Sequence, residues 1–277
     1  MFRAAAALVS AASPGPARPA QSQATYEVYA VRYATLPAFP VRALVAGADS
    51  ARRLDIAMIV WVLRGPAGRT VLVDAGFYRD TFILEWKPAD FVRPTDAIAA
   101  LGIRPEDVTD IIISHVHWDH LDGADRFPRA RLWIQRAEYE YYVGAGGAVL
   151  HRGIDPLDAA MLARLRTAGR VMLVEGDDRE VLPGIRVYTG GRHTWASQFV
   201  GVRTRAGTAV IASDNLYLYE NLERRRPIAQ TLDSTSNLAA QARMAGLASS
   251  PRLIVPGHDP AVFERFPTPG RGVARIE

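Results

Sequence analysis

The stretch His115-Val116-His117-Trp118-Asp119-His120 decides the fold of this chain. It puts three imidazoles and a carboxylate within one short turn, although the whole chain holds only six histidines. Such a cluster is unfavourable unless its members share a cation. The preceding run, Asp110-Ile111-Ile112-Ile113-Ser114, is apolar and β-branched and predicts a buried strand. The cluster therefore follows a strand end, where active sites of α/β proteins often lie, and we interpret it as a metal site.

The spacing within the cluster predicts room for two ions. Residues two apart on extended backbone project from the same face, so we expect His115 and His117 to share one ion. Asp119 and His120 lie further along and are expected to turn toward a second ion. His151 stands alone, and we interpret it as an ordinary core or surface histidine.

Three further candidate ligands follow predicted strands. His193 comes after Val187-Tyr188-Thr189-Gly190-Gly191, whose glycine pair allows backbone to approach a ligand closely. His258 follows Leu253-Ile254-Val255-Pro256-Gly257 in the same manner. Asp214 ends Val210-Ile211-Ala212-Ser213, and a carboxylate there is able to bridge two ions. Each residue alone also suits a turn cap, but together they complete two coordination shells.

Composition narrows the class of protein. Of 277 residues, 49% are hydrophobic and 22% are charged, which are ordinary values for a folded chain with a sizeable core. The net charge of +4 is a small surplus, and Arg224-Arg225-Arg226 is interpreted as a solvated loop, so we expect no nucleic-acid partner. The chain has no cysteine, so nitrogen and oxygen must hold any metal, which suits Zn²⁺ or another borderline first-row ion.

The N-terminal segment is predicted to be separate from the fold. Residues 1–25 carry one early positive charge, an apolar stretch and a proline-rich end, and are predicted to be a signal peptide or a disordered leader. Residues 26–277 are predicted to form a single domain. The location is periplasmic or secreted if the segment is a signal peptide, and otherwise cytoplasmic. No other stretch approaches the length of a membrane span.

Hydrophobic patterning predicts alternating strands and helices. The predicted strands are at 26–33, 54–63, 70–73, 110–114, 131–135, 171–174, 185–189, 198–204, 208–212 and 253–255. The predicted helices are at 95–101, closed by Gly102, at 136–142, at 156–167 with Asp155 as N-cap, and at 234–248. This order favours an α/β fold in which helices flank sheets.

The ordered motif resembles that of a known superfamily. The string His115-x-His117-x-Asp119-His120, followed by His193, Asp214 and Gly257-His258, resembles the metallo-β-lactamase superfamily of dinuclear metallohydrolases. The segment Val71-Leu72-Val73-Asp74-Ala75-Gly76 is similar to the upstream strand and D-x-G element of that superfamily. The resemblance spans residues 55–260 and implies an αββα sandwich, with two mixed sheets packed face to face and helices outside.

Within the superfamily the chain is most similar to the N-acyl-homoserine lactonases. A bridging aspartate without a cysteine ligand resembles glyoxalase II and these lactonases, not the antibiotic-hydrolysing enzymes. Tyr217, three residues after Asp214, and the segment Ile134-Gln135-Arg136-Ala137-Glu138-Tyr139 also look like the lactonases. The chain departs from them at Gly191-Arg192-His193, which lacks the usual proline-glycine, and in carrying the bulky Trp118.

The resemblance implies a ligand set and a reaction. One Zn²⁺ would be held by three histidines and a second by a mixed set, with Asp214 shared between them. The first set is His115, His117 and His193, and the second is Asp119, His120 and His258. The implied enzyme is a dinuclear zinc-dependent hydrolase that opens a lactone by a metal-bridging hydroxide, with Asp119 or Tyr217 carrying protons. An N-acyl-homoserine lactone would make it a quorum-quenching enzyme.

Several expectations stay open at this stage. Asp74 is expected either to hold the motif loop or a ligand imidazole through hydrogen bonds, or to cap a turn. The aromatic segment 77–86 is expected to wall an apolar pocket or to lie in the core. The alternative reactions are hydrolysis of phosphotriesters, thioesters or other esters, and less favourably iron-dependent redox chemistry or binding without turnover. The expected partner is a small lactone or ester, and the expected assembly is a monomer or homodimer.

Overall fold

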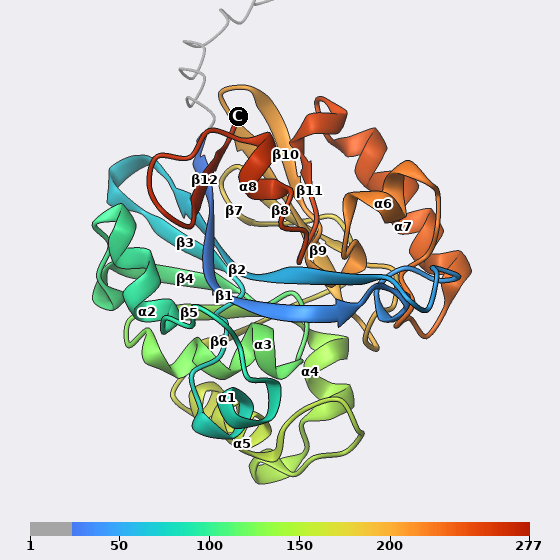
Figure 1. The fold of residues 1–277 in the computed structure, drawn as a ribbon. Coiled ribbons are helices and arrows are strands. Elements are labelled where there is room, and N and C mark those ends of the chain that lie inside the picture. The colour runs from blue at the N-terminus through green and yellow to red at the C-terminus, as the bar shows by residue number, and fades with distance from the viewer. Residues whose placement is uncertain (1–23) are drawn as a thin grey trace, which may run out of the picture.

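Two mixed β-sheets lie face to face in the computed structural model, which describes residues 24–277 (Figure 1). The larger sheet has the strand order β12-β1-β2-β3-β4-β5-β6, and the smaller has the order β11-β10-β9-β8-β7. Strands β3 to β6 pair in parallel, as do β10 and β11, and the remaining pairs are antiparallel. The predicted leader at 1–25 falls outside the described residues, except for its last two positions.

The strands follow the predicted pattern closely. Their bounds are β1 (Glu27–Pro40), β2 (Arg53–Arg64), β3 (Thr70–Val73), β4 (Val108–Ile112), β5 (Arg131–Gln135), β6 (Val171–Val174), β7 (Arg179–Leu182), β8 (Ile185–Thr189), β9 (Gln198–Thr204), β10 (Gly207–Ile211), β11 (Ile254–Val255) and β12 (Val273–Ile276). Every predicted strand is present, but β7 and β12 were not predicted. Both are four-residue strands at the edges of their sheets.

The helices lie outside the sheets. Their bounds are α1 (Asp80–Trp86), α2 (Pro94–Ala97), α3 (Trp118–Leu121), α4 (Arg136–Tyr142), α5 (Pro156–Thr167), α6 (Tyr219–Glu223), α7 (Ser234–Leu247) and α8 (Val262–Arg265). The helix predicted at 95–101 is present in two parts, because α2 passes into a 3-10 helix, Ile98–Leu101, and Gly102 ends it at φ +69° as predicted. Asp155 caps α5 as predicted and accepts a hydrogen bond from the backbone N–H of Leu157.

Four layers result from how apolar side chains are distributed. Between the sheets, residues such as Trp61 and Val73 pack against Val187 and Val200. The other face of the larger sheet is covered by the helices at the bottom of Figure 1, and α7 covers the smaller sheet, where Met244 is buried. The predicted αββα sandwich is confirmed. None of the helices among the described residues combines the length and apolarity needed to cross a bilayer.

This arrangement gathers several strand ends at one edge. The motif 115–120 follows β4, which is parallel to β3, and residue 214 follows β10, which is parallel to β11. The carboxyl ends of parallel strands from both sheets therefore meet, which is where ligand sites form in open α/β sheets. Residue 193 joins them from the connection between β8 and β9, and residue 258 follows β11.

Candidate metal centre

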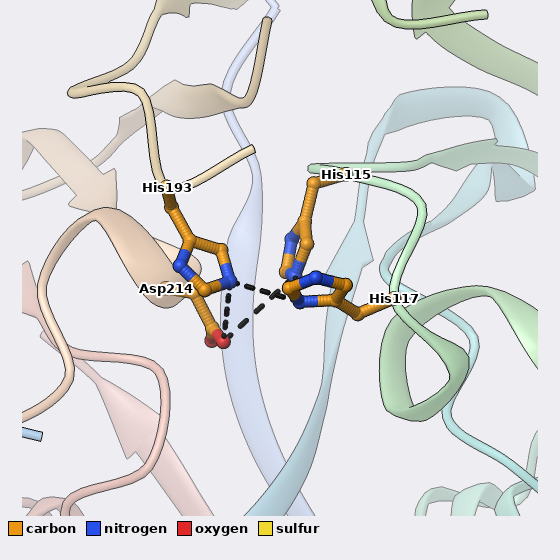
Figure 2. A group of neighbouring side chains, drawn as sticks. All are labelled: His115, His117, His193 and Asp214. Carbon is orange, nitrogen blue, oxygen red and sulfur yellow. Dashed lines mark hydrogen bonds and ion pairs between the residues drawn. The ribbon is translucent and has the colours of Figure 1, made fainter. Parts of the chain in front are cut away.

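The structure brings together all seven side chains that the sequence singled out as ligands. They form two adjacent groups in which the donor atoms lie within 4.8 Å of one another: His115, His117, His193 and Asp214 in the first, and Asp119, His120 and His258 in the second. Figure 2 shows the first group, with His115 and His117 entering from one side and His193 and Asp214 from the other. Residues from both sheets therefore complete one cluster.

The Asp214 carboxylate lies between the two groups. Its Oδ2 atom is 3.4 Å from Nε2 of His193 and 3.8 Å from Nε2 of His115. Its Oδ1 atom is 2.9 Å from Nε2 of His258 and 3.2 Å from Nε2 of His120. One oxygen therefore faces each group, which is the disposition that a bridging carboxylate requires.

The first group presents lone pairs toward a common point. Nδ1 of His117 lies 3.0 Å from Nε2 of His115 and 2.9 Å from Nε2 of His193. Burial, followed by the charge of neighbouring imidazoles, lowers the pKa of His117 to about 3 and that of His115 well below its usual value. These imidazoles therefore stay neutral, the form in which histidine binds a metal.

The outer ring nitrogens are held by acceptors. Nδ1 of His193 lies 2.7 Å from the Gln230 carbonyl, and Nδ1 of His258 lies 3.0 Å from the Ala57 carbonyl. Because a carbonyl only accepts, each Nδ1 donates to it, and in the neutral ring each inward Nε2 is left with a free lone pair. This arrangement fixes ring orientation in metal-binding histidines.

The second group carries an excess of negative charge. Burial opposes protonation of His120, but Asp119, Asp214 and Asp74 together raise its pKa well above the usual value. Nε2 of His120 and Oδ1 of Asp214 are buried and make no hydrogen bond among the described residues. A buried ring nitrogen and a buried carboxylate oxygen without hydrogen-bond partners fit a divalent metal ion, whose charge would replace that of the imidazolium.

Asp74 joins the motif loop to the loop before Asp214. Its Oδ1 accepts the Ser114 backbone N–H at 2.8 Å, and its Oδ2 lies 2.8 Å from Nδ1 of His120. The same Oδ2 accepts the Ser213 hydroxyl at 2.9 Å. Of the two expectations for Asp74, the hydrogen-bonding role is the one observed, and it includes both the motif loop and a ligand imidazole. Asp74 and Ser213 have φ values of +61° and +48°, a strained conformation for residues other than glycine and typical of functional sites.

A cavity of about 210 Å³ opens onto the cluster. Its apolar lining is Leu36, Phe39, Leu44, Ile56, Met58, Trp86 and Trp118, and its polar lining is His117, Asp119, Asp214, Tyr217, Gln230 and His258. Of the aromatic segment 77–86, Trp86 lines this cavity, whereas Phe77 and Phe82 are buried in the core. Both alternatives for that segment therefore hold, each for different residues.

Tyr217 lies beside the first group. Its hydroxyl is 3.4 Å from Nδ1 of His193, and its ring is stacked at a tilt on His258 with centroids 5.8 Å apart. Burial, with a further contribution from Asp214, raises the pKa of Tyr217 well above its usual value. The hydroxyl therefore remains protonated and is available as a hydrogen-bond donor.

His151 and the glycine pair before His193 were also singled out in the sequence. His151 is exposed and stacks on Tyr141 with ring centroids 3.9 Å apart, outside the cluster, as predicted. The glycine pair before His193 lies close to buried side chains of the protein itself. A Cβ on Gly190 would lie 2.1 Å from Oδ1 of Asn215, and one on Gly191 would lie 2.4 Å from Cα of Asn237. The pair makes room for two buried asparagines that brace the His193 loop.

Comparison with known proteins agrees with this geometry. A family model described as "Metallo-beta-lactamase superfamily" matches residues 59–258. An N-acyl homoserine lactonase from Bacillus sp is 29% identical over 221 residues, covering 74% of this chain and 82% of that protein. Another from Bacillus thuringiensis is 30% identical over 190 residues, covering 66% of this chain and 70% of that protein.

Solved structures show the same fold. An N-acyl homoserine lactone hydrolase with its product N-hexanoyl-L-homoserine at the catalytic metal center has a TM-score of 0.71 at 22% identity, covering 88% of this chain and 98% of that one. AidC, a dizinc quorum-quenching lactonase, has a TM-score of 0.63 at 13% identity, covering 92% and 98%. With the family model matching most of its length, the chain belongs to the metallo-β-lactamase superfamily.

Proposed function

We propose that this protein is a dinuclear zinc hydrolase that opens lactone rings, N-acyl-homoserine lactones in particular. The observation that carries the proposal is the position of Asp214, whose two carboxylate oxygens face separate donor groups at the base of an apolar cavity. The lactonases among its relatives support the substrate class. His115, His117 and His193 would hold one ion, Asp119, His120 and His258 the other, and Asp214 both.

The donors suit Zn²⁺ because all are imidazoles and carboxylates and the chain has no thiolate. A pair of such ions, when bound, would lower the pKa of water toward about 7 and would polarise a carbonyl group. The protein itself keeps His115, His117 and His193 neutral, because burial lowers the pKa of each of these imidazoles. Nearly all of the cluster is buried, and only His117 and Asp119 are partly exposed, both on the cavity side.

Two side chains are placed to assist ring opening. Hydrolysis adds water across the ester bond, so the hydroxyl joins the carbonyl carbon and a proton goes to the ring oxygen. Tyr217, which stays protonated, would donate a hydrogen bond to the carbonyl oxygen as negative charge develops there. Asp119 lines the cavity and would hold the proton that passes to the leaving alkoxide.

The apolar side of the cavity would accept an acyl chain. Trp86 and Trp118 stack with ring centroids 5.3 Å apart, and Phe39 stacks on Trp86 at 6.4 Å. Burial of methylene groups against such rings contributes about 0.8 kcal/mol each. A lactone with an attached hydrocarbon chain therefore matches this site better than a compact charged ester.

The test is to monitor hydrolysis of a panel of substrates by NMR, with protein of measured metal content. The panel would contain N-acyl-homoserine lactones of short and long chain, an aryl phosphotriester, a thioester and a linear ester. We expect the acyl lactones to have the highest kcat/KM. Faster turnover of the phosphotriester or thioester would refute the lactone assignment, and oxygen consumption by an iron-loaded protein that is inactive on esters would refute hydrolysis.

A further inference from the structure

Glu138, in α4, is a buried carboxylate without an ionic partner. Its side chain has no solvent exposure, and no lysine, arginine or histidine among residues 24–277 forms an ion pair with it. Burial raises its pKa to about 7, and the hydrogen-bond donors around it oppose that rise. Placing a carboxylate in such a position is unfavourable unless its oxygens are well satisfied. The hydrogen bonds that satisfy the Glu138 oxygens therefore indicate what this side chain does.

Three donors from two loops converge on this carboxylate. Oε1 accepts the backbone N–H of Val116 at 3.2 Å and the hydroxyl of Thr194 at 2.5 Å. Oε2 accepts the backbone N–H of Ala196 at 2.6 Å. Val116 belongs to the loop after β4 in the larger sheet, and Thr194 and Ala196 belong to the β8–β9 connection in the smaller sheet. One side chain thus joins segments that approach the site from opposite sides.

These contacts involve only one of the two donor groups. Val116 lies between His115 and His117, and Thr194 directly follows His193. The second group has separate supports, because His120 is held by Asp74 and His258 by the Ala57 carbonyl. We propose that Glu138 is a positioning residue that sets the spacing of His115, His117 and His193 and thereby the metal affinity of the first site, independently of the second. This inference rests on the proposed two-metal centre.

The chemistry of the contacts requires a carboxylate. All three neighbours donate, and two of them are backbone N–H groups that cannot reverse their role. A glutamine in this position would present an NH₂ group on one side, so in either orientation a backbone N–H would face another donor. The Glu138→Gln side chain would therefore keep the shape of glutamate but lose at least one of the hydrogen bonds that join the two loops.

The test measures metal binding and not turnover. Zinc-loaded wild-type protein, the Glu138→Gln variant and the Glu140→Gln variant would be titrated with a chelator at pH 8. Glu140 lies on the same helix, is exposed and pairs with Arg136, so it serves as the matched control. We expect wild type and Glu140→Gln to hold two ions equally well, and Glu138→Gln to keep one and to bind the other about 10- to 100-fold more weakly. Zinc-edge anomalous diffraction would then show reduced occupancy beside His115, His117 and His193.

A second variant covers the case in which Glu138→Gln does not fold. Thr194→Val removes one of the three donors at nearly constant volume, and we expect a smaller loss of affinity at the same site. Equal weakening of both sites, weakening of the site at His258 alone, or unchanged affinity in both variants would overturn the inference. Wild-type protein that holds two ions yet opens no lactone would refute the proposed substrate and leave the role of Glu138 standing.

Discussion

Oδ2 of Asp74 lies 2.8 Å from Nδ1 of His120 and 2.9 Å from the hydroxyl of Ser213, the residue before Asp214. Through one oxygen atom, Asp74 at the end of β3 therefore orients His120, a ligand of the second donor group, and the loop that carries Asp214. Asp74 contacts a ligand of the second group directly, and it reaches the first group only through the Ser114 hydroxyl, which lies 2.9 Å from Nδ1 of His115.

Replacing Asp74 by asparagine should weaken the second metal site. The asparagine would present its NH₂ group either to the donating Nδ1 of His120 or, in the flipped orientation, to the donating backbone N–H of Ser114. We expect a loss of zinc affinity of about 10- to 100-fold at that site, measured by chelator competition. The exposed Asp178, paired with Arg186, gives the control Asp178→Asn. Unchanged affinity in Asp74→Asn would show that its hydrogen bonds do not orient the ligand.

Removing the Tyr217 hydroxyl should slow catalysis without loss of metal. The hydroxyl lines the cavity and remains protonated, so Tyr217→Phe deletes a donor near the developing oxyanion. We expect kcat on a lactone to fall by about 10²-fold. Tyr219→Phe is the control, because the Tyr219 hydroxyl lies outside the cavity lining and has no hydrogen-bond partner among the described residues. A full rate in Tyr217→Phe with both ions bound would exclude this role.

Truncating Trp86 should affect long acyl chains more than short ones. Its ring stacks between Phe39 and Trp118 on the cavity wall and is 37% exposed. We expect Trp86→Ala to raise KM for a long-chain lactone about tenfold, equivalent to about 1.4 kcal/mol of lost contact, with little change for a short-chain lactone. Leu84→Ala, on the same helix at 74% exposure, should change neither value. An equal rise for both lactones would place the acyl chain elsewhere.

Stability should depend on pH through Asp158, which lies away from the metal cluster. Burial raises the pKa of Asp158 from 3.8 to about 8; Arg79, whose guanidinium lies 2.7 Å away, opposes the rise, and Asp122 and Asp155 add to it. The folded state therefore retains a proton that the unfolded state releases. The stability from this group is complete below pH 3.8 and is lost as the pH rises toward 8.

The variant Asp158→Asn should remove this dependence. Between pH 5 and pH 8 its free energy of unfolding, measured with urea, should improve relative to wild type by about 2–4 kcal/mol, from 1.36 kcal/mol per pKa unit. Asp80→Asn, an exposed aspartate next to Arg79, should follow the wild-type slope. Parallel pH profiles for wild type and Asp158→Asn would contradict the raised pKa.

The sequence predicted the candidate metal ligands best, because these polar side chains come directly after apolar strand-like runs. The motif 115–120, together with His193, Asp214 and His258, could be found because each follows an apolar strand-like run, and the structure brings them all together. Strand β1 was predicted to end at 33 but continues to Pro40, because the bulge between Leu36 and Phe39 accommodates Pro37. Proline inside a bulge looks like a strand end in the sequence.

Most of the groups that hold the ligand residues in place through hydrogen bonds could not be predicted from the sequence. The carbonyls of Ala57 and Gln230 hold ligand imidazoles, and every residue has a carbonyl, so no residue type marks them. Glu138 belongs to a segment that resembles the lactonases. A glutamate in a short helix is usually solvent-exposed, so the sequence pattern alone does not indicate that Glu138 is buried. Its role depends on contacts across 22 and 56 positions of chain, which no local pattern records.

The most direct test of the two-metal centre is a zinc-edge anomalous difference map from crystals of zinc-loaded protein. We predict two peaks about 3.5–4 Å apart. One should lie among His115, His117 and His193, the other among Asp119, His120 and His258, with one Asp214 oxygen directed to each. A single peak, or peaks that Asp214 does not join, would contradict this prediction.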